Sequence, residues 1–235
     1  TFEVREGIWK QRDTETSRAL GYGETFAGQR APLLEAQIAD CVDSIAYDHH
    51  DLDDALKAGL IRRDDLRGIA AVDEAEQAVL RLFQDTGQGA DTAERVHRQE
   101  LIRYLRRQQI QDLIQETERR LAEEQIKSLD DVRQAPHALV GLSEPVRKNK
   151  LALQSLLQEQ VYRHWRVKRA VEKGQRLLER LFAEFIAKPH LLPEEYQEWV
   201  ERAGAHRGVC DYIAGMTDRY AQREYRQLFA PFDPT

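Results

Sequence analysis

The chain has 235 residues, of which 41% are hydrophobic and 32% are charged, and its net charge is −6. This length suits one large domain or two small ones, and neither a run of about 18 apolar residues nor a basic-then-apolar leader marks it as a membrane or secreted protein. Two cysteines supply neither a disulfide framework nor a thiolate zinc site, so we expect a cytoplasmic protein with no membrane partner.

Apolar residues recur at helical spacing between few glycines and prolines, which predicts an all-α fold. The expected helices cover residues 2–10, 32–58, 64–68, 73–84, 92–125, 143–161, 166–186, 193–203 and 205–229, separated by loops that include 13–29 and 86–91. Thr92 is the expected N-cap of the helix that follows it. Because no repeat or shift in composition marks a second domain, we predict a single all-helical region over residues 1–235.

The charges of the chain are concentrated in two segments of opposite sign. Residues 31–60 hold seven carboxylates and one base, a net charge of −6, whereas residues 147–180 hold ten bases and three acids, a net charge of +7. Such segments suggest a cation and an anion as partners, although solvated helix faces without a function produce the same counts.

Asp43, Tyr47 and Asp51 fall on one face of the predicted helix 32–58, over roughly 12 Å of its length, and His50 joins them. These side chains make a poor core surface, since each would need a partner if buried, but a reasonable wall for a cleft. Asp43 could give one oxygen to a divalent cation, and Asp51 could accept hydrogen bonds from a sugar hydroxyl. From spacing alone, a solvated acidic face remains the simpler interpretation, because a metal site needs three or more ligands.

Three segments of the chain have a distinctive sequence. The main one is IADCVDSIAYDHHDLDDALKAGL at residues 38–60, and the others are FEVREGIWK at 2–10 and VCDYIAGMTDRYA at 209–221. Together they resemble the deoxyguanosinetriphosphate triphosphohydrolase-like proteins of the HD-domain superfamily. The resemblance covers essentially the whole chain. It implies a multi-helix HD-domain-like bundle, in which residues 1–60 are the remainder of the HD core and residues 61–235 are a C-terminal helical extension packed on it.

For function, the resemblance implies hydrolysis of a deoxynucleoside triphosphate, such as dGTP, to a deoxynucleoside and triphosphate with a divalent metal (Mg, Mn, Fe or Ni). Asp43 would be a metal ligand, Tyr47 would line the sugar and phosphate region, and Asp51 would bind the 3′-hydroxyl group. In the family pattern, the other motifs, a His, a His-Asp pair and a proton-handling group, all precede the segment that begins this chain. The only His-Asp dipeptide of this sequence, His50-Asp51, belongs to the late helix and is not the expected metal-binding pair. We therefore expect no catalytic residue in this chain and no activity from the chain alone.

A basic segment contains the second group of candidate residues, in the string VYRHWRV at 161–167. The resemblance implies that Tyr162 and His164 border the nucleotide pocket, and Arg163 and Arg166 could meet triphosphate oxygens because guanidinium groups suit phosphate geometry. A helix corner with Trp165 packed and the bases solvated is the alternative interpretation. The pI of about 5.7 disfavours nucleic acid as a partner for this segment.

Two function classes remain open from the sequence. The first is the enzyme described above, for which the resemblance also implies a homo-oligomer, with a hexamer as one option. The second is a non-catalytic helical module for nucleotide sensing or assembly. A His followed by a His-Asp pair upstream of this chain would favour the enzyme.

Overall fold

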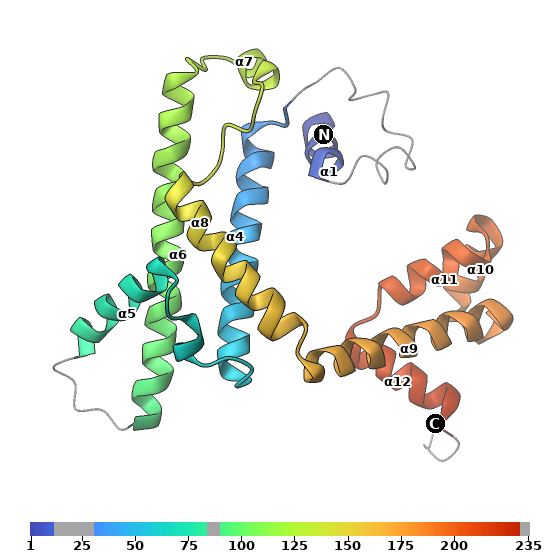
Figure 1. The fold of residues 1–235 in the computed structure, drawn as a ribbon. Coiled ribbons are helices and arrows are strands. Elements are labelled where there is room, and N and C mark those ends of the chain that lie inside the picture. Colours follow the sequence, from blue (N-terminus) through green and yellow to red (C-terminus); the bar gives the residue numbers. More distant parts are fainter. Residues whose placement is uncertain (12–30, 84–89, 231–235) are drawn as a thin grey trace. The chain divides into compact units, whose positions relative to one another are not determined.

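A computed structural model describes residues 1–11, 31–83 and 90–230, and these residues form helices and no strand (Figure 1). The predicted all-α fold class is confirmed. The predicted loop 13–29 lies outside the described residues, as does most of the loop 86–91, whose last two residues belong to a helix. Within the described part of the chain, no helix has the length and apolar character needed to cross a membrane.

The chain divides into two compact units, Thr1–Tyr162 and Arg163–Thr235. The predicted division after residue 60 is not a boundary between compact units, because one hydrophobic cluster joins residues from both sides of it. This cluster combines Leu52 and Ala55 with Leu101, Leu105 and later residues. The predicted single region, with residues 1–60 as the remainder of an HD core and residues 61–235 as an extension packed on it, stays a prediction.

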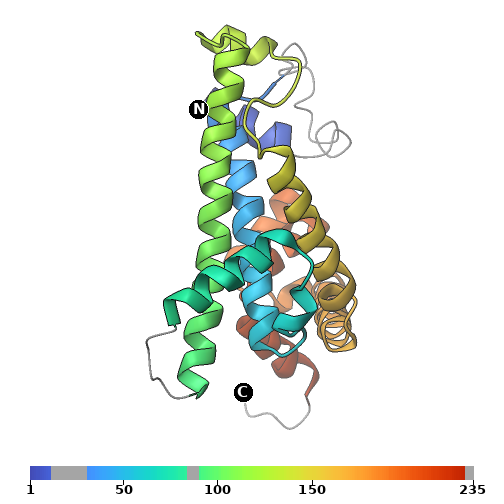
Figure 2. The same cartoon turned by 60° about the vertical axis from the view of Figure 1, so that its left-hand side comes forward.

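Most of the first unit consists of long helices that share this cluster (Figures 1 and 2). Its elements are α1 (Phe2–Gln11), α4 (Leu34–Lys57), η1 (Arg63–Leu66), α5 (Ala70–Phe83), α6 (Ala90–Glu123), α7 (Leu129–Gln134), α8 (Glu144–Leu156) and η2 (Leu157–Tyr162). Helices α4 and α6 run side by side, and α5 packs on α6. Gly59 ends α4 with a φ of +62°, a backbone conformation that glycine adopts without a steric penalty.

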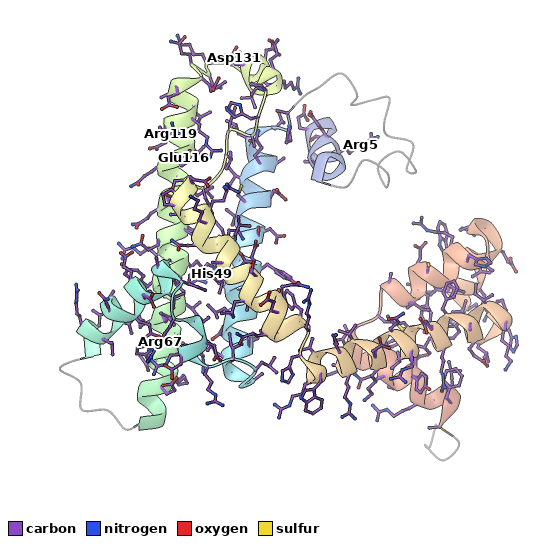
Figure 3. All side chains as sticks on the ribbon, viewed as in Figure 1. Arg5, His49, Arg67, Glu116, Arg119 and Asp131 are labelled. Atoms are coloured by element: carbon purple, nitrogen blue, oxygen red, sulfur yellow. The ribbon has the colours of Figure 1, made fainter. Side chains whose placement is uncertain are left out.

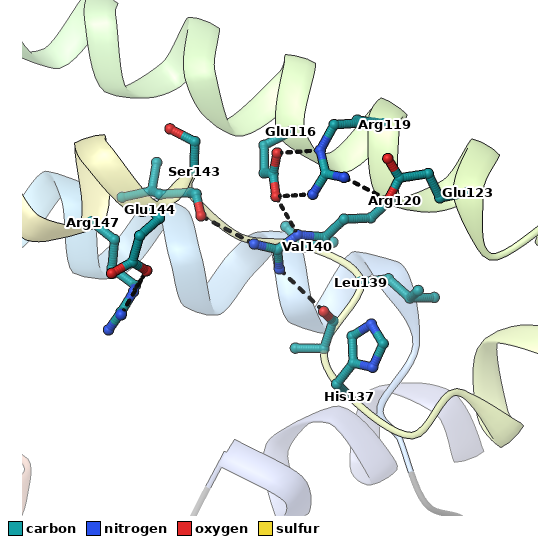
Figure 4. A network of polar contacts seen from close by, with 12 residues as sticks. Glu116, Arg119, Arg120, Glu123, His137, Leu139, Val140, Ser143, Glu144 and Arg147 are labelled. Carbon is teal, nitrogen blue, oxygen red and sulfur yellow. Dashed lines mark hydrogen bonds and ion pairs between the residues drawn. The ribbon is translucent and has the colours of Figure 1, made fainter.

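Charged side chains of α6 form hydrogen bonds with the segment before α8 (Figure 4). The Arg120 guanidinium donates to the carbonyl oxygens of Ala138, at 3.2 Å, and Leu142, at 3.1 Å, and its Nε donates to Glu116 at 2.8 Å. Asp112 then accepts from both the backbone N–H and the hydroxyl of Ser143, at 2.8 and 2.6 Å. The start of α8 is therefore held at a defined place along α6.

The second unit contains a separate core. Its elements are α9 (Trp165–Ala187), η3 (Pro189–Leu191), α10 (Glu194–Ala203), α11 (Ala205–Ala214) and α12 (Asp218–Phe229), and its buried residues include Leu181, Phe185, Leu192, Val209, Tyr212 and Ala221. Gly208 brings α11 close to α10, since a Cβ atom there would lie 2.5 Å from a methyl carbon of Val200.

Several predicted helices differ from the structure, among them the helix 143–161, which is α-helical only to Leu156. The predicted helix 205–229 is wrong, because it is interrupted between α11 and α12, where the Thr217 hydroxyl accepts from the Tyr220 N–H at 3.3 Å and caps α12. Thr92 is not an N-cap, because α6 already begins at Ala90. Helix α7 was not predicted, although Ser128 and Asp131 form a reciprocal capping box that is visible in the sequence.

Candidate functional site

Helix α4 presents the predicted stripe on its outer side. Its inner side is buried through Ile45, Leu52 and Ala55, while Asp43 and His50 are exposed and the Tyr47 side chain is 61% exposed. One helix spans all four predicted residues, so its periodicity holds Asp43, Tyr47 and Asp51 on one face. The metal-binding and substrate-binding roles of these residues stay predictions.

Tyr162 and Asp51 meet in the structure, although 111 residues separate them in the sequence. The Tyr162 hydroxyl donates a hydrogen bond to Oδ2 of Asp51. Burial, the hydrogen bond to Asp51 and the charge of Asp51, in that order, raise the pKa of Tyr162 above its ordinary value, with a smaller effect from Tyr47. The phenol therefore stays protonated and remains a donor, and two residues that were predicted to bind substrate lie in direct contact.

The remaining predicted residues, Arg163, His164 and Arg166, belong to the second unit. Nδ1 of His164 accepts from the Arg166 N–H at 3.2 Å and caps the N-terminus of α9. The guanidinium of Arg166 lies 5.6 Å from the ring centroid of Trp165, which is 57% exposed. A helix corner with Trp165 packed inside is therefore wrong: the ring lies at the surface beneath cationic side chains.

Asp48, Lys150 and Gln154 form a buried polar cluster that the sequence did not reveal. The Lys150 ammonium pairs with Oδ2 of Asp48, and the Gln154 amide donates to both carboxylate oxygens at 3.1 Å. The side chains of Asp48 and Lys150 are 5% and 13% exposed. Since these partners are 102 to 106 residues apart, no local pattern could have paired them.

Helix α4 also buries a histidine, His49, which was not among the predicted site residues (Figure 3). Its Nδ1–H donates to the carbonyl of Ile45 at 2.6 Å, so Nε2 carries the lone pair. Nε2 makes no hydrogen bond to any described residue. Burial lowers the pKa of His49 below its ordinary value, and the nearby charges of Arg106 and Lys150 act in the same direction. The ring is therefore neutral near pH 7.

The described residues do not make a complete metal centre. Across residues 1–11, 31–83 and 90–230, no three His, Cys, Asp or Glu side chains are grouped so that they could hold a metal ion. Asp43 has the carboxylate oxygens that a hard divalent cation prefers, but it is one ligand where three or more are needed.

Two grooves lie away from the predicted stripe, at the end of α4. One is about 650 Å³ and lies along η1 and α5, with Arg67, Asp73 and Gln77 in its wall. The other, about 400 Å³, is lined by residues that include Lys57, Arg62 and Arg98. None of the predicted site residues lines either groove, so these two hollows give no support to the predicted site.

Comparison with known proteins gives consistent matches. Residues 140–227 match the model of a phosphohydrolase-associated domain, which includes α8, α9 and the segment that contains Tyr162 and His164. A protein of Azoarcus sp. (strain BH72) is 40% identical over 97% of this chain, one of Bordetella pertussis is 40% identical over 97%, and one of Geobacter metallireducens is 37% identical over 99%. All three are named deoxyguanosinetriphosphate triphosphohydrolase-like proteins.

These relatives are longer than this chain, which spans 58 to 59% of their length. The matches cover nearly the whole chain, so they include helix α4, the segment that contains Tyr162, and residues 209–221 near the C-terminus. They therefore confirm the resemblance recognised from the sequence: over nearly its whole length, the chain is similar to deoxyguanosinetriphosphate triphosphohydrolase-like proteins.

Proposed function

We propose that the protein encoded by the complete gene hydrolyses deoxynucleoside triphosphates such as dGTP to a deoxynucleoside and triphosphate. The observation that carries this proposal is the contact of Tyr162 with Asp51 on the face of α4 that also bears Asp43 and Tyr47. The names of the relatives and the match to a phosphohydrolase-associated domain support the same reaction class.

In this proposal, Asp51 binds the 3′-hydroxyl of the deoxyribose. One carboxylate oxygen of Asp51 accepts from Tyr162, and an ionised carboxylate has several acceptor positions, so it can also accept from a sugar hydroxyl. The exposed ring of Tyr47 lies one helical turn before Asp51 and would line the sugar and phosphate region. Together, Tyr162 and Asp51 would orient the sugar relative to Asp43.

Asp43 would supply one oxygen ligand to a divalent cation (Mg, Mn, Fe or Ni), and the other ligands would have to come from outside the described residues. Tyr162 and His164 would border the nucleotide pocket, and Arg163 and Arg166 would meet the triphosphate oxygens, for which guanidinium groups are suited. We also propose a cytoplasmic homo-oligomer, with a hexamer as one option, and no nucleic-acid partner. These are parts of the proposal that rest on the family resemblance.

A non-catalytic nucleotide-sensing or assembly module is the second candidate function. It is favoured by the lone Asp43, since no three metal-binding side chains are grouped in the described part of the chain. Such a module would bind a deoxynucleoside triphosphate on the same face of α4 without cleaving it.

The test measures triphosphate release from each of the four deoxynucleoside triphosphates with Mn²⁺ or Mg²⁺, using protein expressed from its complete gene. Asp43→Ala should lower the rate about 100-fold or more, the scale expected when a group that stabilises developing charge is removed. Asp40→Ala, an exposed acid one turn earlier on α4, is the matched control and should keep parental activity. Full activity in Asp43→Ala would remove Asp43 from the site, and binding without release would favour the sensing module.

A further inference from the structure

Three positions of α4, namely Ser44, Asp48 and Asp51, accept hydrogen bonds from α8 and η2. The Lys150 ammonium donates to the carbonyl of Ser44 at 3.3 Å and pairs with Asp48, Gln154 donates to Asp48, and Tyr162 donates to Asp51. At about 100° per residue, positions 44, 48 and 51 lie within about 60° of one another on α4. These contacts therefore connect one side of α4 with α8 and η2.

The three donors would not share an edge if residues 144–162 formed a regular α-helix. With Lys150 at 0°, Gln154 would lie at about 40° but Tyr162 at about 120°, turned away from α4. Residues 157–162 instead form a wider π-helical turn, which advances by about 82° per residue and returns Tyr162 to about 30°. This turn explains how one helix delivers Lys150, Gln154 and Tyr162 to the same stripe.

The same turn also keeps the apolar side of the helix in register. It brings Val161 to about −52°, close to Leu153 at about −60°. Both side chains are buried in the first unit's core together with Leu157. The apolar packing and the polar contacts thus demand the same geometry, in which one extra residue is taken up between Leu157 and Tyr162.

We propose that Lys150 is a positioning residue of the candidate site. Through Asp48 and the Ser44 carbonyl, it sets the register of α4 against α8, and in this register the wide turn places the Tyr162 hydroxyl on Asp51. Ser44 directly follows Asp43, so the same ammonium supports the turn of α4 that bears the proposed metal ligand. The consequence for catalysis rests on the proposed function, whereas the consequence for the contact between Tyr162 and Asp51 does not.

The first test is independent of activity. A double-mutant cycle of Tyr162→Phe and Asp51→Asn, measured by the midpoint of thermal unfolding, should show a non-additive shift of about 3 °C in the parent. The same cycle in a Lys150→Met background should be additive, and Lys150→Arg should restore part of the coupling. Lys148→Met, at a 73% exposed position of the same helix, is the matched control and should keep the full coupling.

Lys150→Met leaves Asp48 buried without its cation and should lower the unfolding midpoint by about 6 °C or more. If that variant does not fold, Asp48→Asn combined with Lys150→Met removes both charges and serves in its place. Full coupling of Tyr162 with Asp51 in either folded background would overturn the proposal, because Lys150 would then contribute stability alone.

The length of the wide turn gives a second test of register. Deleting the exposed Glu159 should convert the turn to a regular α-helical turn that leaves Tyr162 at about 20°, so the coupling should survive. Inserting one alanine after Glu159 should rotate Tyr162 by roughly another 80 to 100° and abolish the coupling. Coupling that survives the insertion would show that the register does not set this contact.

In protein from the complete gene, Lys150→Met should raise KM for the deoxynucleoside triphosphate about tenfold while kcat changes less, because binding of the sugar is weakened. If KM were unchanged although the coupling was lost, Lys150 would set the contact between Tyr162 and Asp51 without affecting substrate binding, and its role in the candidate site would be overturned. Absence of hydrolysis in the parent would instead contradict the proposed function, and the coupling measurements would still decide the register.

Discussion

The two units of the protein bury different kinds of side chains. The first unit buries Gln37, Asp48, His49 and Gln109 among its apolar residues. In the described part of the second unit, Arg163–Ala230, the buried side chains are apolar except for the hydroxyl of Tyr212. Apolar packing tolerates small shifts, whereas a buried polar group is costly unless it meets its own partner, so polar burial restricts register.

This difference agrees with the positions of the candidate residues. Asp48 and its partners lie on the helix that carries the Asp43 stripe, and they fasten that helix at one register. The second unit instead gathers aromatic rings, since the centroid of Tyr212 lies 5.4 Å from that of Phe185 and 4.7 Å from that of Tyr196. The C-terminal signature 209–221, for which the sequence suggested no chemistry, thus supplies packing through Tyr212 and, at 3.1 Å from its hydroxyl, Tyr220.

The largest expected effect tests the apolar core of the second unit. Phe185→Ala should lower the free energy of unfolding by about 4 kcal/mol, because the side chain is fully buried against Tyr212 and its loss leaves a cavity. Leu178→Ala, at a 44% exposed position of the same helix, should cost less than about 1 kcal/mol. Urea denaturation of both variants gives the comparison, and equal losses would show that the second unit does not depend on this core.

A smaller effect tests whether hydrogen bonds from an arginine to backbone carbonyl groups, rather than its charge alone, stabilise the first unit. Arg120→Ala should cost about 2 kcal/mol, since it removes the donors to two carbonyl groups in the segment before α8 (Figure 4). Arg119→Ala should cost less than about 1 kcal/mol, because this side chain is 52% exposed and contacts only Glu116 and Glu123 among the described residues.

The pKa of Glu116 gives a second measurement on the same two variants. Hydrogen bonds from Arg119, and next from Arg120, lower the pKa of Glu116 to about 2. Removing either arginine should raise this pKa, which a carboxyl ¹³C titration by NMR can follow. If Arg119→Ala proved as costly as Arg120→Ala in urea denaturation, the charge network and not the carbonyl contacts would hold this segment.

The smallest effect concerns the pH dependence of the first unit. His49 has a pKa below its ordinary value of 6.5 in the folded state because it is buried, so the unfolded state takes up a proton first as the pH falls. The contribution of His49 to stability is therefore complete above about pH 6.5 and decreases as the pH falls below it. The midpoint of urea denaturation, measured from pH 8 to pH 5, should follow this decrease.

His49→Gln should flatten that part of the profile, since glutamine does not titrate. His190→Gln, at an exposed position, should leave the profile of the parent unchanged. A His49→Gln profile that matches the parent would assign the pH dependence to other groups.

Local sequence patterns were sufficient for the helices and for the stripe on α4. The apolar spacing, the glycine after α4 and the proline after α9 depend on residues a few positions apart, and helix formation follows from such local interactions. The same locality explains why the four-residue spacing of Asp43, Tyr47 and Asp51 was enough to assign them to one face. Even the capping box of α7 is present in the sequence, in Ser128 and Asp131, although the apolar spacing did not indicate a helix there.

Only the tertiary structure determined the partners of these side chains. Helical periodicity places Asp48 and Asp51 on a face, but it contains no information on whether that face meets water, Lys150 or Tyr162. It also predicted a regular helix through residue 161, whereas residues 157–162 form a wide turn, with which the helix both contacts α4 and packs into the core. Contacts between residues about 100 positions apart depend on how the helices pack against one another, and the local sequence pattern does not contain that packing.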